Sequence, residues 1–248
     1  MTELDGTTAL VVGAGRGLGR GIALALADAE AAVVGVARTG GDLDELAAAN
    51  GRIRTETADA ADPETAWRIL DRYEPDVLVL VAGANPVMRP LQHHTWETFS
   101  ANWNADVKIA FTWLREALLR PLRPGGRIVV VSSGAAIGGS PASGGYAGAK
   151  AAQRFIAGYA QDESDRAGLG LAVTAVLPKI TPHGDIGRRG IRAYAARSGE
   201  TEDVFTKRLG DLLTPERAGS AVLELVRTDP PELAAGYLLT AAGLTKLP

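Results

Sequence analysis

The sequence of 248 residues contains no cysteine. This absence excludes a disulfide framework, a thiolate metal site and a cysteine nucleophile, and it leaves the redox compartment undetermined. There are three histidines, His93, His94 and His183, and none is paired with a carboxylate at the spacing of metal ligands. We therefore expect the histidines on the surface or in loops, and we predict no metal site.

The chain also has no excess of positive charge and no long apolar segment. Its formal net charge is −3, whereas a nucleic-acid-binding protein is normally basic. The longest apolar run, Val77 to Ala84, is too short to cross a bilayer. The segment from Met1 to Gly6 is acidic and lacks the apolar core of a signal peptide. These features predict a cytoplasmic protein without a nucleic-acid or membrane partner.

The residues that are present suit one folded domain over positions 1–248. Hydrophobic residues make up 46% of the chain and charged residues 22%, which allows a large buried core. Apolar strand-like runs alternate with helical patterns, which predicts a mainly parallel sheet covered by helices on both faces. The seven predicted strands end at Val12, Ala37, Thr57, Val81, Ser132, Leu177 and Leu239. The predicted helices span Leu18–Ala29, Pro63–Tyr73, Trp96–Leu119, Tyr146–Ala167 and Pro215–Arg227.

One long segment, residues 179–213, interrupts this alternation. It is polar and follows the C-terminal end of a strand, where α/β sheets bind ligands. We predict that it forms a substrate lid; the alternative is a pair of solvated surface helices. Four of its residues, Lys179, His183, Arg188 and Arg192, favour an anionic substrate by their charge.

The first predicted strand leads into a glycine-rich loop, with glycines at 13, 17 and 19, and then into a helix. Glycines at such a turn let the backbone approach a pyrophosphate, and the helix N-terminus offers free N–H groups to it. A Walker-type phosphate loop is excluded, because no Gly-Lys-Ser/Thr follows. The loop therefore predicts a dinucleotide site.

The end of the second strand indicates which dinucleotide is bound. An NAD site usually has an acid there, but no acid occurs between Glu30 and Asp42. Arg38 follows this strand and Arg16 lies in the glycine loop. Two guanidinium groups favour a 2′-phosphate, so we predict NADP(H) over NAD(H). The alternative is that Arg38 only ends a strand in solvent.

Tyr146 and Lys150 are four residues apart and so share one face of a helix. Ser133 lies 13 residues before Tyr146, at the end of a predicted strand. Its hydroxyl is expected to face the same crevice at the edge of the sheet. The alternative for Ser133 is a hydrogen-bonded hydroxyl at the end of a strand. The alternative for Tyr146 is a half-buried aromatic side chain on a helix. Neither would have a catalytic role.

On these residues the chain resembles the short-chain dehydrogenase/reductase family along nearly its whole length. Asp59 matches the family's adenine-contacting acid, Ala82-Gly83 its fourth-strand motif and Pro178 its Pro-Gly motif. The resemblance implies a Rossmann-like, doubly wound fold and a catalytic Ser133, Tyr146 and Lys150. Together with the arguments above, it assigns cofactor binding to Gly13, Arg16, Gly17, Leu18, Gly19, Arg38, Asp59, Ala60, Ala82, Gly83, Tyr146, Lys150 and Pro178.

The same resemblance implies roles for the catalytic residues. Carbonyl reduction needs a hydride at carbon and a proton at oxygen. Tyr146 would donate the proton, and Lys150 would stabilise the resulting oxyanion and hold the nicotinamide ribose. Ser133 would hydrogen-bond the substrate oxygen.

Several positions depart from the family pattern. Val12 stands in place of Thr, and Leu80 and Val81 in place of two Asn, so an apolar contact would replace a polar one between neighbouring strands. Asp106 stands where an Asn completes the catalytic set, unless the register shifts to Asn102 or Asn104. Lys179 replaces the glycine of Pro-Gly and adds a cation near the nicotinamide.

We therefore predict an NADPH-dependent reductase of a ketone or aldehyde. One alternative is an imine reductase or a non-redox biosynthetic enzyme on the same scaffold. Another is a cofactor-binding sensor with weak catalysis. The resemblance also implies a homodimer or homotetramer, formed through the helices at 96–119 and 146–167.

Overall fold

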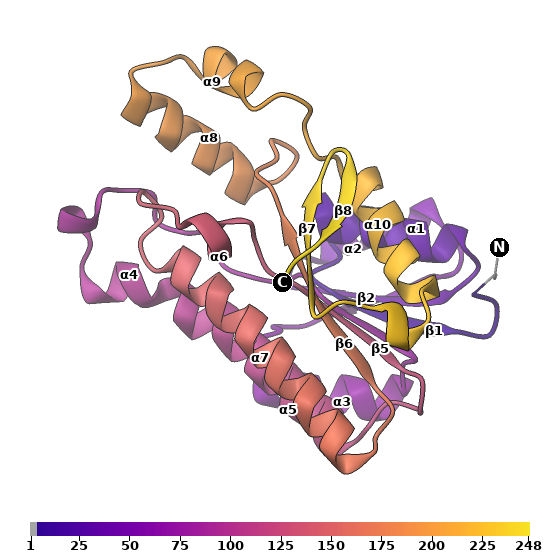
Figure 1. Cartoon of the computed structure of the whole chain (residues 1–248). Coiled ribbons are helices and arrows are strands. Elements are labelled where there is room, and N and C mark those ends of the chain that lie inside the picture. Colours follow the sequence, from indigo (N-terminus) through magenta and orange to yellow (C-terminus); the bar gives the residue numbers. More distant parts are fainter. Residues whose placement is uncertain (1–3) are drawn as a thin grey trace.

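The computed structural model describes residues 4–248, so Met1 to Glu3 of the segment considered for a signal peptide lie outside the described residues. The described chain forms one eight-stranded sheet in the order β3-β2-β1-β4-β5-β6-β7-β8 (Figure 1). Strands β1 to β7 pair in parallel, and β8 pairs antiparallel with β7. The strands are β1 Thr8–Val12, β2 Ala32–Ala37, β3 Ile53–Thr57, β4 Val77–Leu80, β5 Arg127–Val131, β6 Ala172–Pro178, β7 Gly236–Thr240 and β8 Gly243–Lys246.

Helices cover both faces of the sheet, which confirms the doubly wound, Rossmann-like fold (Figure 1). Helices α1, α2 and α10 pack on one face around a core that includes Leu26, Leu46 and Val222. Helices α3, α5 and α7 pack on the other around Ile69, Trp113 and other buried residues. The helices are α1 Gly17–Asp28, α2 Gly40–Ala49, α3 Pro63–Tyr73, α4 Trp96–Asn102, α5 Lys108–Leu119, α6 Ala135–Gly138, α7 Tyr146–Ala167, α8 Asp185–Ser198, α9 Glu202–Arg208 and α10 Pro215–Arg227.

The structure corrects two of the predicted elements. It contains an eighth strand, β8, which is four residues long and exposed at the edge of the sheet, so no buried apolar run marks it in the sequence. The predicted helix Trp96–Leu119 is interrupted by a π-helical segment, Trp103–Val107, between α4 and α5. A π-helical turn adds one residue to a helical turn and re-aims the side chains within it. Asp106 lies in this segment and is fully buried.

The predicted lid segment folds as two helices, α8 and α9, joined by a short turn. Ile191, Ala195 and Phe205 form a small core of their own between them. In Figure 1 the pair stands clear of the main helical layers, beyond one end of the sheet. None of the helices in residues 4–248 is both long and apolar enough to span a membrane.

The strand order reverses direction between β1 and β4, because β1 is followed outward by β2 and β3 while β4 begins the other half. Parallel α/β sheets bind ligands at such a switch point, outside the carboxyl ends of the strands. A cleft of about 890 Å³ lies there, which places the candidate site.

Candidate active site

The cleft runs from the glycine loop at one end to Tyr146 at the other. Every residue that the sequence assigned to cofactor binding lines it, and so does Ser133. Residues of α8 and α9 line the same cleft, among them Ile186, Tyr194 and Phe205. The fold therefore brings together the loops that follow β1 to β6.

The glycine loop has the close backbone contacts of a dinucleotide cradle. Gly13 has a φ of 99°, and a Cβ added there would lie 2.6 Å from the Ala82 nitrogen. A Cβ at Gly19 would clash with the Gly13 carbonyl. The N-terminus of α1 has no side-chain cap and no acid in its first turn, so its N–H groups remain available to an anion. These residues fit a pyrophosphate group.

The end of the cleft predicted to hold the adenosine contains side chains of both signs: Arg16 and Arg38 are basic, and Asp42 is acidic. Arg38 is exposed and lines the cleft. Arg16 also lines it, but its guanidinium forms an ion pair with Asp185 at the start of α8, with 3.0 Å between Nη1 and Oδ2. Asp42 lines the cleft as well and lies against the glycine loop, because a Cβ at Gly15 would be 3.6 Å from its Oδ2. An acid from α2 therefore reaches the end of the cleft where the predicted 2′-phosphate would lie.

The loop after β3 is held in place by the helical layer of α3, α5 and α7. The fully buried Trp113 of α5 donates a hydrogen bond from Nε1 to the Ala60 carbonyl, at 2.9 Å. Asp59 is exposed, and its Oδ1 accepts from the Ala61 nitrogen. The Asp59 side chain thus lies at the rim of the cleft, with its backbone anchored through the neighbouring residue.

The candidate catalytic residues meet at the other end of the cleft. Ser133 follows β5, and its Oγ accepts a hydrogen bond from the Ala135 nitrogen at 3.2 Å, so its own proton remains available. Tyr146 is the first residue of α7 and is 9% exposed. One turn further, the Lys150 ammonium lies 5.7 Å from the centre of the Tyr146 ring. Ser132 ties α7 to β5, because its Oγ donates to the Lys150 carbonyl.

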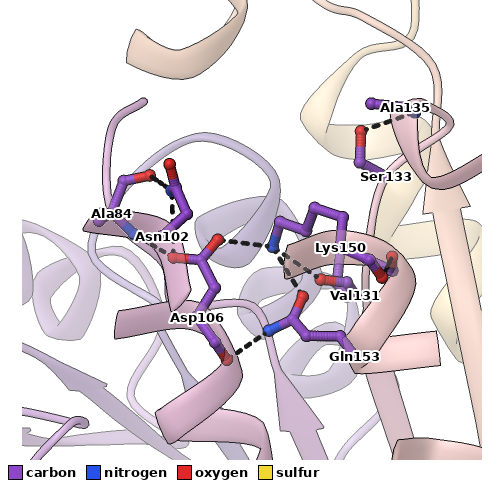
Figure 2. Close-up of polar contacts among 9 residues, drawn as sticks. Ala84, Asn102, Asp106, Val131, Ser133, Ala135, Lys150 and Gln153 are labelled. Atoms are coloured by element: carbon purple, nitrogen blue, oxygen red, sulfur yellow. Dashed lines mark hydrogen bonds and ion pairs between the residues drawn. The ribbon is translucent and has the colours of Figure 1, made fainter. Parts of the chain in front are cut away.

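Lys150 is buried in a polar network that Figure 2 shows. Its Nζ donates to Gln153 Oε1 at 2.9 Å and, at a long 3.5 Å, to the Val131 carbonyl. Asp106 Oδ2 forms an ion pair with Nζ at 3.3 Å. The Gln153 side chain closes the network by donating from Nε2 to the Asp106 carbonyl.

Asp106 lies behind Lys150 and does not line the cleft, whereas Lys150 does. Its Oδ1 accepts from the Ala84 nitrogen at 2.7 Å and from Asn102 Nδ2 at 3.4 Å. Asn104 is exposed and bonds to Ser100. Of the three residues considered for the fourth catalytic position, Asp106 is therefore the one that forms the ion pair with Lys150.

The Lys150 ammonium therefore has three oxygen neighbours within the chain. It donates to the Gln153 amide oxygen and to the Val131 carbonyl, and it forms an ion pair with Asp106 Oδ2, which accepts no hydrogen bond within the described residues. A ribose hydroxyl that bonds to this ammonium has to compete with these neighbours. The bond to Val131 is the weaker of the two hydrogen bonds by geometry.

The other departures from the family pattern fall at packed or cleft-lining positions. Val12 and Leu80 are direct neighbours across β1 and β4 and are buried in the same core cluster. Val81 follows β4, and its nitrogen donates to the Val12 carbonyl. Lys179 is exposed and lines the cleft directly after β6.

The histidines lie away from the cleft lining. The half-buried His94 contacts Thr98 and the Arg89 carbonyl through its two ring nitrogens, at 3.1 Å each. His93 and His183 are exposed. In the described part of the chain, no three His, Cys, Asp or Glu side chains are grouped so that they could hold a metal ion.

Sequence reasoning missed three side chains of this site. Gln153 is three residues from Lys150 on the same helix, a spacing that marks it as a neighbour of the ammonium. Asp42 lies on α2 and Tyr194 on α8, and no local pattern in the sequence places either side chain at the cleft. Their positions become evident only when the loops meet over the sheet.

Comparison with known proteins agrees with this geometry. The family model described as short chain dehydrogenase matches residues 7–188. L-xylulose reductase of Mesocricetus auratus is 29% identical over 180 residues, which cover 73% of this chain and 68% of that protein.

Two solved structures share the fold. NAD+-bound xylitol dehydrogenase superposes with a TM-score of 0.83 at 20% identity, over 95% of this chain and 97% of that one. A short chain dehydrogenase from Mycobacterium avium has a TM-score of 0.78 at 24% identity, over 100% of this chain and 86% of that one. The chain therefore belongs to the short chain dehydrogenase family and is an NAD(P)-dependent oxidoreductase that acts on CH–OH or carbonyl groups.

Proposed function

We propose that the protein is an NADPH-dependent reductase of a ketone or aldehyde in which Tyr146 donates the proton. The observation that carries this proposal is the meeting of Ser133 and Tyr146 at one end of the cleft, with the Lys150 ammonium directly behind the phenol. When a reduced nicotinamide cofactor is bound, the chemistry it supplies is a hydride for the carbonyl carbon.

Each residue of this group has a separate task. Ser133 donates a hydrogen bond to the carbonyl oxygen and so positions the substrate against Tyr146. Tyr146 transfers its phenolic proton to that oxygen as negative charge develops there. Lys150 stabilises the phenolate by its positive charge, and Asp106 offsets part of that charge from 3.3 Å. Gln153 Oε1 accepts a hydrogen bond from the ammonium and helps to hold it in place.

Arg38 supports the preference for NADPH. It is exposed and lines the adenosine end of the cleft, so its guanidinium is available to a 2′-phosphate. The negative charge of Asp42 acts against this preference. Arg16 adds its full positive charge to the 2′-phosphate site only when its ion pair with Asp185 is broken.

Residues 179–213 serve as the substrate lid in this proposal. The support is that Thr181, Ile186, Tyr194 and Phe205 from this segment line the cleft. Tyr194 also contacts the loop before α7, because its hydroxyl lies 2.7 Å from Ser140 Oγ and accepts from the Ala142 nitrogen. Closure of the lid would exclude water from the hydride-transfer end.

A homodimer or homotetramer formed through α4, α5 and α7 also belongs to the proposal. Four aromatic side chains on these helices are exposed by more than half: Trp96, Phe111, Phe155 and Tyr159. Exposed apolar surface of this kind is typical of protein interfaces.

The test of the central proposal is Tyr146→Phe, assayed with NADPH and a panel of ketones and aldehydes. Loss of the proton donor should lower kcat by about 10²- to 10⁴-fold. NADPH binding, followed by nucleotide fluorescence, should stay close to that of the unmodified protein. Tyr159→Phe is the matched control, because Tyr159 lies on the same helix but is exposed. Turnover that survives Tyr146→Phe unchanged would remove the proton-donor role.

The network around Lys150 favours a second candidate, a cofactor-binding sensor with weak catalysis. Because the ammonium already donates to Gln153 and Val131 and is paired with Asp106, Lys150 is less available to a ribose and to the reaction. The same panel distinguishes the two candidates. NADPH binding without turnover of any carbonyl compound would support the sensor, and turnover that depends on Tyr146 would support the reductase.

A further inference from the structure

The substrate end of the cleft carries one cation that the proposed reaction does not use. Of the four basic residues that favoured an anionic substrate, Lys179 alone lines the cleft within residues 4–248. His183 is exposed outside it. The other two are engaged at the surface of the lid, since Arg188 pairs with Asp185 and Arg192 pairs with Glu202.

The backbone places Lys179 beside the candidate catalytic serine. Strands β5 and β6 are parallel neighbours with Val131 opposite Val176. This register continues past the strand ends, where the Gly134 nitrogen donates to the Pro178 carbonyl at 2.9 Å. A Cβ built on Gly134 would lie 3.9 Å from the Cα of Lys179. Lys179 therefore follows β6 at the same level at which Ser133 and Gly134 follow β5.

The ammonium of Lys179 is available to a ligand. Its side chain is exposed, and it makes no ion pair or side-chain hydrogen bond with any residue in the described range 4–248. The other cations that line the cleft are either paired with a carboxylate or lie at its other end. Arg16 is paired with Asp185, Lys150 is paired with Asp106, and Arg38 lies at the adenosine end.

The remaining lining at this end is mostly apolar or already hydrogen-bonded. Met88, Ile137, Ile186 and Phe205 contribute apolar side chains. Tyr194 and Ser140 bond to each other. Such a lining suits a substrate with an apolar body. A charged group on that substrate would find its complement in Lys179.

We infer that the substrate is a carbonyl compound with a carboxylate next to the reacting carbon, a 2-oxo acid with an apolar side chain, and that Lys179 binds the carboxylate. The inference rests on the proposed reductase function and deepens it. Ser133 would hold the carbonyl oxygen, so an anion that reaches the neighbouring Lys179 has to be attached close to that carbonyl. Lys179 is thus a residue that determines substrate specificity.

Two probes, one anionic and one neutral, test this inference: phenylglyoxylate and its methyl ester. Both contain the same ketone and aromatic ring, but only the acid is anionic. With NADPH, Lys179→Gln should lower kcat/KM for phenylglyoxylate by about 10- to 100-fold, the range for a lost charge-assisted hydrogen bond. It should change kcat/KM for the ester by less than about twofold. Lys179→Arg should retain most of the activity on the acid, because it keeps the charge.

Lys207→Gln is the matched control, because Lys207 is exposed on α9 and lies outside the cleft lining. Calorimetric titration with mandelate, the alcohol corresponding to phenylglyoxylate, gives a readout that does not require turnover. In the presence of NADP+, Lys179→Gln should weaken mandelate binding by the same factor, while Lys207→Gln should not.

The outcomes separate this inference from the proposed function. Equal effects of Lys179→Gln on the acid and the ester, or no effect on either, would overturn the inference while reductase activity on the ester stands. Absence of turnover with all carbonyl compounds would contradict the reductase proposal. In that event, mandelate binding that depends on Lys179 would still support an anion site, and binding indifferent to Lys179 would overturn it.

Discussion

Asp106 and Lys150 form a buried ion pair, which is the most unusual feature of the site at the scale of single residues. Their side chains are 0% and 4% exposed, so both charges have left water. Such a pair is tolerated when further hydrogen bonds satisfy its remaining atoms. Here the Ala84 nitrogen and Asn102 donate to Oδ1 of the carboxylate, and Gln153 accepts from the ammonium. The other carboxylate oxygen, Oδ2, faces the ammonium at 3.3 Å and accepts no hydrogen bond within the described residues. The Lys150 charge is therefore held in place but partly neutralised.

Removal of one partner of this pair should be strongly destabilising. Asp106→Ala leaves a buried ammonium without its countercharge, and we expect a loss of about 3–5 kcal/mol in the free energy of unfolding. Asp106→Asn should cost less, because its Oδ1 can still accept from the Ala84 nitrogen. Urea denaturation measures both, with the exposed Asn104→Ala as a control expected within about 0.5 kcal/mol of the unmodified protein. A loss below about 1 kcal/mol for Asp106→Ala would show that the pair contributes little.

Cofactor preference should depend on two opposing residues at the adenosine end. Arg38→Ala should weaken NADPH binding about tenfold or more, through loss of a charge-assisted contact to the 2′-phosphate, with little effect on NADH. Asp42→Asn should shift the preference in the opposite direction, because it removes the negative charge beside the glycine loop. Dissociation constants from nucleotide fluorescence give the ratio. A ratio that neither variant changes would remove both residues from cofactor selection.

At the scale of elements, the contact between β3 and α3 is held by a partly buried acid. Glu56 of β3 accepts from the Tyr73 hydroxyl and from Arg72 at the end of α3, at 2.7 Å each. Arg68 adds a longer contact of 3.5 Å. The hydrogen bond from Tyr73, with the charge of the two arginines in support, lowers the pKa of Glu56 although burial opposes this effect.

This lowered pKa makes the contact between β3 and α3 sensitive to acid. A carboxyl whose pKa is lower in the folded than in the unfolded state stabilises the fold above its unfolded pKa, about 4.3, and loses that contribution as the pH falls through its folded pKa. Glu56→Gln should therefore reduce stability at neutral pH, and its difference from the unmodified protein should shrink in acid. Urea denaturation across a pH series measures this difference. If Glu56→Gln gave the same loss at every pH, ionisation of Glu56 would not be the cause. Tyr73→Phe should remove part of the same pH dependence.

For the whole molecule, the lid and the glycine loop are joined by one ion pair. Asp185, at the start of α8, pairs with Arg16 and with Arg188. A hydrogen bond from Arg188, with the charge of Arg16 in support, holds the pKa of Asp185 below its usual value. The carboxylate is thus ionised at neutral pH. Because Arg16 is also a candidate for binding the 2′-phosphate, the two anions compete for one guanidinium.

Breaking this connection should loosen the lid without affecting the core. Asp185→Asn should raise hydrogen exchange in α8 and leave the exchange of β1 and β4 unchanged. It should also tighten NADPH binding by about two- to fivefold, the range for release of a surface ion pair. Arg16→Gln should loosen α8 as well but weaken NADPH binding. Arg188→Gln is the comparison, because Arg188 lies outside the cleft lining. Unchanged exchange in α8 for both Asp185→Asn and Arg16→Gln would show that this ion pair does not hold the lid.

Much of the fold follows from local signals along the chain. Helices α3, α7 and α10 begin and end where the sequence predicted. Asp62 caps α3 and Thr214 caps α10, each by accepting from a backbone nitrogen in the first turn. Gly168 ends α7 in the left-handed conformation. Such caps act within a few residues, so they can be read from the sequence alone.

The sequence by itself determined the parallel sheet, the glycine loop and the spacing of Ser133, Tyr146 and Lys150, because strand periodicity, turn chemistry and helix spacing are local properties. Tertiary structure alone decided what surrounds them. It placed Asp106 within an ion pair with Lys150 and brought Asp42 to the glycine loop. These contacts join segments far apart in the chain, and their electrostatic effects depend on distance and burial, which no local pattern specifies.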